Sequence, residues 1–96
     1  MANKVTKINK IDPPHIYVLR EYNENCTCKY KTKIYIKRGE STFHITSHYD
    51  FKNAYEATHT LALISLLPIY VWIYKDDKLT RTTLDKELEK ENAKSS

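Results

Sequence analysis

The sequence predicts an α+β domain, a small and mostly antiparallel sheet with one main helix packed on one of its faces. Residues 28–37 and 42–49 alternate along the chain with a period of two, which is typical of strands that have one buried face. Residues 51–67 place apolar side chains at i, i+3 and i+4, the spacing of an amphipathic helix. At 96 residues there is room for one hydrophobic core, so we expect a single domain.

We divide the chain into a basic N-terminal arm, an α+β domain and a charged C-terminal tail, over residues 1–14, 15–84 and 85–96. Lysines recur at every third position of the arm, which ends at two consecutive prolines. Leu84 and Leu88 are the large apolar residues near the tail, so we expect at best a helix exposed to solvent that frays beyond about Glu91.

The first half of the domain reads as three strands. Residues 15–22 are rich in β-branched and aromatic side chains and predict the first strand, and residues 28–37 predict the second. Gly39 lies in the hairpin loop that follows, where a positive φ is needed. Residues 42–49 predict the returning strand.

The second half begins with the helix. Asp50 is a suitable N-cap, and Pro68 should end the helix because proline cannot continue it. Residues 69–75 then predict a strand with apolar side chains on both faces. A turn at Asp76-Asp77 allows a further short strand over 79–83. The expected order is therefore β-β-β-α-β, with that extra strand as an option.

Positive charge is concentrated in the first part of the chain. Residues 1–38 contain nine Lys and Arg against three Asp and Glu, a net charge of +6, whereas residues 39–96 carry −2. Such asymmetry indicates a polyanionic partner such as nucleic acid, and it argues against an acidic nucleic-acid mimic.

A single helix can cover one face of a sheet and leaves the other open. We expect the open face to combine lysines, histidines and aromatic rings, with an arginine in the hairpin loop. The candidate binding residues are Lys29, Lys31, Lys33, Tyr35, Lys37, Arg38, His44, His48, Tyr70, Trp72 and Tyr74. Because lysines neutralise phosphates and flat rings stack on unpaired bases, this face predicts a non-enzymatic protein that binds nucleic acid or nucleoprotein.

Two other interpretations stay open. Lysines on a strand can be a solvated face that prevents edge pairing, in which case the aromatic strand is covered by the arm, the tail or a second copy of the chain in a homodimer. The alternative function is a protein inhibitor or adaptor of the phage or mobile-element type. It would occlude a host protein through the aromatic strand or through Leu63 and Leu67.

Motifs for catalysis and metal binding are weak. His44-Ile45-Thr46 matches one half of the paired His-x-Thr element of two-histidine phosphoesterases, and a small phosphoesterase is the least supported hypothesis. Cys26 and Cys28 are separated by one residue instead of two, and His44 and His48 would be about 13 Å apart at about 3.3 Å per residue. We expect no metal, no cofactor and no enzymatic activity.

Nothing in the sequence indicates a membrane protein. The longest apolar run, 61–74, contains Pro68 and is shorter than the roughly 20 residues of a spanning helix. Met1 to Lys10 has no apolar core of a secretory signal, and two cysteines suit a reducing compartment. We therefore expect a cytoplasmic protein.

Overall fold

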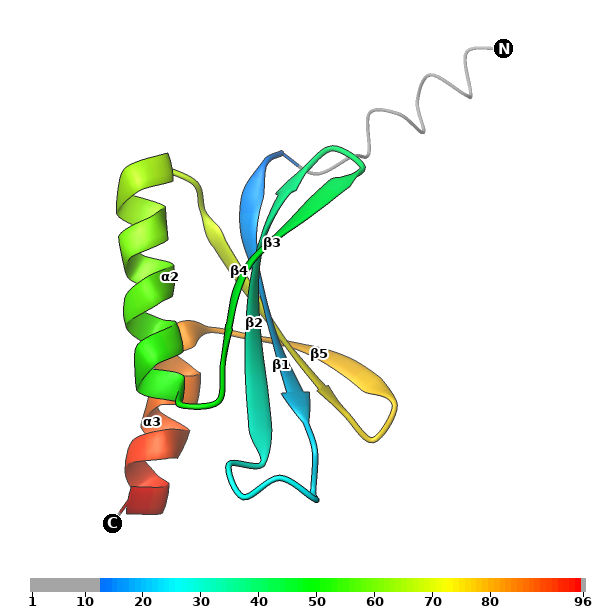
Figure 1. Cartoon of the computed structure of the whole chain (residues 1–96), viewed down its shortest axis with the longest axis vertical. Helices are drawn as coiled ribbons and strands as arrows, with labels where there is room; N and C mark the ends of the chain where they lie inside the picture. Colours follow the sequence, from blue (N-terminus) through cyan, green and yellow to red (C-terminus); the bar gives the residue numbers. More distant parts are fainter. Residues whose placement is uncertain (1–12, 96) are drawn as a thin grey trace.

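The computed structural model describes residues 13–95, with side chains to Ala93. Most of the expected basic arm, residues 1–12, lies outside the described residues. The described part confirms the α+β class: strands form one mixed sheet, and helices pack on it (Figure 1).

The sheet has five strands in the order β3-β2-β1-β4-β5, all antiparallel to their neighbours except the parallel pair β1 and β4. The strands are β1 (His15–Tyr22), β2 (Tyr30–Arg38), β3 (Ser41–His48), β4 (Ile69–Lys75) and β5 (Lys78–Thr82). The optional last strand is thus present. Gly39 has φ +58 in the turn between β2 and β3, as expected from the sequence. Asp76 and Asp77 also take positive φ, which suits the two-residue turn between β4 and β5.

Helix α2 (Phe51–Ser65) connects the edge strand β3 to β4 on the far side of β1. Its N-cap is Asp50, whose side chain accepts from the backbone N–H of Lys52. The helix ends two residues before the expected end. The Ser65 hydroxyl donates to the Leu61 carbonyl and accepts from the N–H of Leu67, and Leu66 turns into the left-handed region. These local bonds stop the helix before Pro68 does.

The core lies between the sheet and α2. Alternate residues of β1, β2 and β4 are buried together with the inner side of the helix. The buried apolar residues are Ile16, Val18, Ile34, Phe51, Ala54, Val71 and Leu84. Ile69 and Val71 point toward the helices, as the alternation of β4 predicts.

Residues expected as a charged tail form most of a second helix, α3 (Leu84–Ser95), which packs against the domain. Both helices lie on the same side of the sheet (Figure 1). Glu87 is fully buried, and its carboxylate accepts from the guanidinium of Arg20 on β1 at 2.6 Å. Arg20 also bonds Glu91 at 3.0 Å and Thr32 at 3.2 Å. Few apolar residues of α3 reach the core. The ion pair between Arg20 and Glu87 therefore attaches α3 to the sheet at a specific position.

No helix within the described residues is both long enough and apolar enough to cross a membrane.

Candidate nucleic-acid interface

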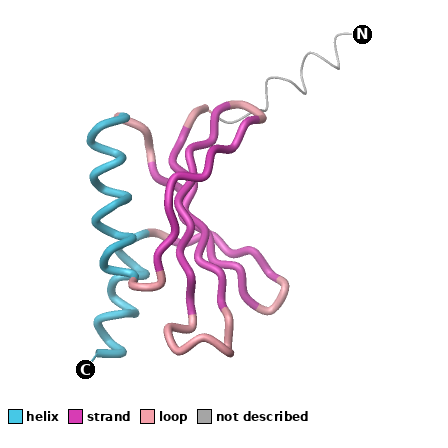
Figure 2. The backbone as a smooth tube through the Cα atoms, in the orientation of Figure 1, coloured by secondary structure: helices cyan, strands magenta, loops and turns pink. Residues whose placement is uncertain are grey.

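The face of the sheet turned away from α2 and α3 is not covered by another element of the described chain, and the two helices lie together on the opposite side (Figure 2). Strand register identifies the residues on this open face, because directly paired residues point to the same side. Tyr17 pairs with Tyr35 on β2 and with Tyr70 on β4, and Tyr35 pairs with His44 on β3. The four residues therefore form an aromatic row across four neighbouring strands.

Two neighbouring pairs of rings in the aromatic row are in contact. The centroids of Tyr17 and Tyr35 are 5.8 Å apart, and those of Tyr35 and His44 are 5.3 Å apart. At the other end Tyr70 packs on buried His15, with centroids 4.5 Å apart. Burial, followed by the nearby phenol of Tyr35 and carboxylate of Glu21, raises the pKa of the Tyr17 hydroxyl. Tyr17 therefore remains a neutral ring at physiological pH.

Lysines of β2 flank the aromatic row. Lys37 places its Nζ 5.9 Å from the centroid of the Tyr17 ring, and Lys31 places its Nζ 5.5 Å from that of Tyr49. Lys33 is held by Glu21, with Nζ and Oε1 2.8 Å apart, and this hydrogen bond raises the pKa of the Lys33 ammonium. These ammonium groups give the face its positive charge, although that of Lys33 is partly neutralised.

The aromatic side chains of β4 meet an arginine of β5. Trp72 pairs with Arg81, whose guanidinium carbon lies 5.3 Å from the Trp72 ring centroid and 4.6 Å from that of Tyr70. A shallow cleft of about 390 Å³ opens here. Its lining residues are His15, Tyr17, Lys37, Tyr70, Trp72, Leu79 and Arg81. We call it the ring cleft.

Tyr74 lies on the same open face, next to Glu21 on β1 and Leu79 on β5. Its ring is exposed, and its hydroxyl donates to Asp77 in the adjoining turn. The alternation of Tyr70, Trp72 and Tyr74 on one side of β4 is thus as expected.

Three predicted residues do not join this face as expected: Lys29, Arg38 and His48. Lys29 lies before β2 with φ 67, and its Nζ donates to the Glu24 carbonyl, so it is a loop residue. Arg38 is exposed at the end of β2, and by alternation with Lys37 it belongs to the opposite side of the sheet.

His48 was expected on the same face as His44, and this expectation is wrong. A register shift at Ile34 and Tyr35 places one extra residue of β3 opposite β2. His48 consequently pairs with buried Thr32, on the helix side, and its ring bonds the Thr46 hydroxyl. His44 stays on the open face, where its Nε2 lies 2.7 Å from the Ser47 hydroxyl.

Sequence reasoning missed Tyr17 and Arg81 as members of the interface. Tyr17 carries a usable signal, because it alternates with Ile16 and Val18, which are typical core residues. Arg81 carries none, because its place beside Trp72 depends on the register between β4 and β5.

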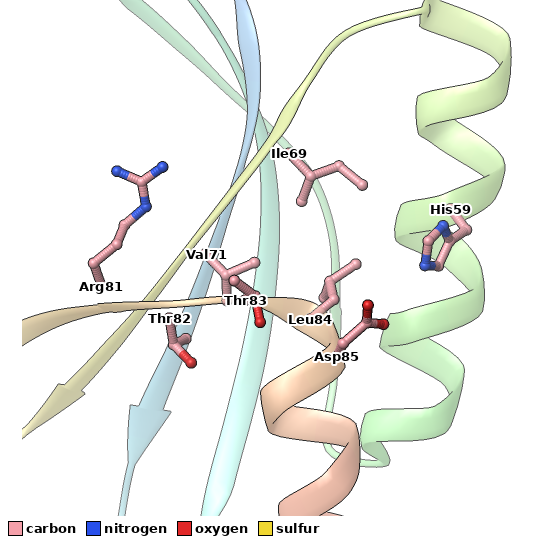
Figure 3. A pocket seen from close by; sticks show the side chains of 8 residues that line it. All are labelled: His59, Ile69, Val71, Arg81, Thr82, Thr83, Leu84 and Asp85. Carbon is pink, nitrogen blue, oxygen red and sulfur yellow. The ribbon is translucent and has the colours of Figure 1, made fainter.

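A second cleft of about 360 Å³ lies on the other side of the sheet, between α2, β4 and the start of α3 (Figure 3). Two of its polar lining residues belong to the helices, His59 to α2 and Asp85 to α3. Tyr55 contacts both: its ring is tilted against that of His59, with centroids 4.5 Å apart, and its hydroxyl donates to Asp85 at 3.2 Å. Figure 3 shows Arg81 and His59 on opposite sides of the β4 ribbon. These contacts make the second cleft part of the helix packing.

The end of α2 carries an exposed apolar patch. Leu63, Ile64 and Leu66 have exposed fractions of 78%, 77% and 86%. Leu67, which the sequence suggested for an outer patch with Leu63, instead packs against the core.

Residues 13–95 contain no group of three or more His, Cys, Asp or Glu side chains able to hold a metal ion. Cys26 and Cys28 are free thiols in the loop between β1 and β2. Compared with known proteins, the chain matches no family model, no curated protein and no solved structure.

Proposed function

We propose that this protein is a non-enzymatic nucleic-acid-binding module that uses the open face of its sheet. The observation that carries the proposal is the aromatic row of Tyr17, Tyr35, Tyr70 and His44, flanked by cations on a face that no described element covers. An aromatic surface left exposed by a small domain usually marks a binding site.

The chemistry of this face suits a polyanion that carries planar groups. Lys31 and Lys37 place their ammonium groups beside aromatic rings of the face, where they can neutralise phosphates. The half-buried rings between them offer stacking surfaces for bases. Free Cys26 and Cys28 suit a reducing compartment, and we propose that the protein acts in the cytoplasm.

The test is the salt dependence of binding to a labelled oligonucleotide of random sequence. The parent protein should lose affinity steeply as salt rises, because binding releases counterions from the phosphates. In the double variant Lys31→Glu/Lys37→Glu, affinity should fall and the slope of log K against log salt should decrease by about one per lysine.

The matched control is Lys52→Glu/Lys86→Glu, which changes the net charge equally on the exposed sides of α2 and α3. This control variant should keep most of the affinity for the oligonucleotide. At physiological salt, charges on the helices are screened from phosphates bound at the opposite face. Absence of binding even at low salt, or an equal loss in both double variants, contradicts the use of this face.

A second candidate function is supported by the exposed leucines at the end of α2. An apolar patch of this kind fits a protein partner, as expected for an inhibitor or adaptor of a host protein or for a homodimer. This candidate predicts a stoichiometric protein partner, or a second copy of the chain, that survives nuclease. The complex should be lost in Leu63→Lys and kept in Lys31→Glu/Lys37→Glu.

A further inference from the structure

We propose that the ring cleft holds one unpaired base, so that the preferred ligand is single-stranded nucleic acid. This inference rests on the proposed function and specifies its ligand. It follows from the shape of the cleft, the direction of its rings and the position of Arg81.

The ring cleft has an aromatic floor with a cation at each side. Tyr17, Tyr70 and Trp72 come from adjacent strands and lie next to one another in the parallel register of β1 and β4. Lys37 borders this floor on the β2 side, and Arg81 borders it on the β5 side. At about 390 Å³ the cleft is at the small end of ligand sites, which suits a single nucleotide unit better than a larger group.

The faces of two rings are turned outward and are covered by a movable side chain, that of Arg81. Arg81 is an exposed residue, and its guanidinium lies over both Tyr70 and Trp72. A planar cation can take that position only where the ring faces point outward instead of into the sheet. The same faces can receive another planar group, a nucleobase, when the guanidinium moves off them.

Duplex nucleic acid cannot use these faces. Its bases are stacked on one another and paired, so that a duplex presents phosphates and groove edges to a protein surface. The rings of the cleft are half-buried and lie between the flanking cations, where a rigid duplex cannot reach them. A single strand can turn a base onto the floor and place its phosphates beside Lys37 and Arg81.

Arg81 has two positions open to it when a base enters. Its guanidinium can lift off the rings and stack on the outer side of the base, or it can turn to the adjacent phosphate. In both positions the cation favours the bound strand. Arg81→Ala should consequently weaken single-strand binding more than Arg38→Ala, which removes the same charge from an exposed position outside the open face.

Trp72 is the only tryptophan of the sequence and gives the experiment its own signal. We would titrate the protein with oligodeoxythymidylate, oligouridylate and duplexes of equal length, recording Trp72 fluorescence and anisotropy of the labelled strand. Either single strand should bind more tightly than its duplex and quench Trp72. A third single strand, oligodeoxyuridylate, differs from oligouridylate in the sugar alone, and this comparison reports whether the 2′-hydroxyl contributes.

The key variants are Tyr70→Leu and Tyr70→Phe, with circular dichroism and the unfolding midpoint as checks on the fold. Loss of the ring should reduce single-strand affinity by roughly 5- to 150-fold, the range for one stacked base, with little effect on duplex binding. Tyr70→Phe should keep parent affinity because it keeps the ring. Should Tyr70→Leu fail to fold, the Trp72 quench and Arg81→Ala still decide the matter.

The outcomes separate the two proposals. Equal binding of single strand and duplex without a change in Trp72 fluorescence overturns the base-holding cleft and leaves nucleic-acid binding in place. Absence of binding to every strand and duplex at low salt overturns both.

Discussion

Arg20 on β1 and Glu87 on α3 are 67 residues apart in the chain, yet their charged groups lie 2.6 Å apart, with both side chains buried. The guanidinium carbon is also 4.4 Å from the ring centroids of both Tyr30 and Phe51, so the cation is enclosed between two aromatic faces. This cluster joins β1, β2, α2 and α3, and it fixes the last helix on the sheet.

Removal of one partner of this pair should strongly destabilise the protein. In Arg20→Met the Glu87 carboxylate stays buried and loses its buried cationic partner, keeping the exposed ammonium of Lys90, so we expect the free energy of unfolding to fall by about 3–5 kcal/mol. Urea unfolding measures this change. The double variant Arg20→Met/Glu87→Met replaces the pair by apolar groups and should recover most of the loss.

The control for this prediction is Lys33→Met, which breaks an ion pair whose side chains are 27% and 37% exposed. Its cost should lie within about 0–1 kcal/mol, as usual for surface pairs. A similar small cost for Arg20→Met would show that the buried pair does not hold α3 in place.

The same site predicts acid sensitivity. Burial opposes ionisation of Glu87, but hydrogen bonds from Lys90, Thr82 and Arg20 outweigh it and hold the pKa of this carboxyl below its ordinary value of 4.5. Because the folded state has the lower pKa, the stabilisation is complete above pH 4.5 and is lost as pH falls through the folded-state pKa. The urea midpoint should therefore drop in the acid range.

Glu87→Gln should lower stability at neutral pH and flatten the dependence on acid pH, since the titrating group is gone. Glu89→Gln, an exposed position on the same helix, should keep the acid sensitivity of the parent. If the urea midpoint of Glu87→Gln depends on pH as that of the parent does, the loss of stability in acid comes from other carboxylates.

Much of the fold was predictable because its elements follow strong local patterns. The alternation of β2 and β4, Asp50 as N-cap and Gly39 in a turn each act within a few residues. The packing of α3 was not predictable in this way. Arg20 reads as an exposed strand residue and Glu87 as part of a charged tail, and only the fold brings them together.

The candidate site was predictable where it depends on alternation and not where it depends on register. Lys31, Lys33 and Tyr35 share a face with each other as expected from the period of two. His48 does not share it with His44, because a single extra residue in β3 reverses the face of everything beyond it. Arg81 likewise reaches Trp72 only through strand pairing.

Removal of α3 should unfold the domain. A chain ending at Thr83 loses Leu84 and Leu88 from the core and leaves Arg20 buried without its carboxylate partners. We expect loss of cooperative thermal unfolding and of near-ultraviolet circular dichroism. A chain ending at Ala93 keeps these contacts and should unfold like the parent, whereas equal stability of both shortened chains would mean that α3 is dispensable.

A glycine should stabilise the end of α2 at one position and destabilise the helix at another. Leu66 has φ 60 and is 86% exposed, so Leu66→Gly removes backbone strain with little loss of packing. The left-handed conformation costs about 1–2 kcal/mol for a residue with a Cβ, and we expect a gain of about 1 kcal/mol. Leu63 is 78% exposed inside the helix, and Leu63→Gly should cost about 1 kcal/mol. Thermal or urea unfolding measures the change in the free energy of unfolding for each variant. The two changes have opposite signs if Leu66 is the left-handed cap, and equal losses of stability show that it is not.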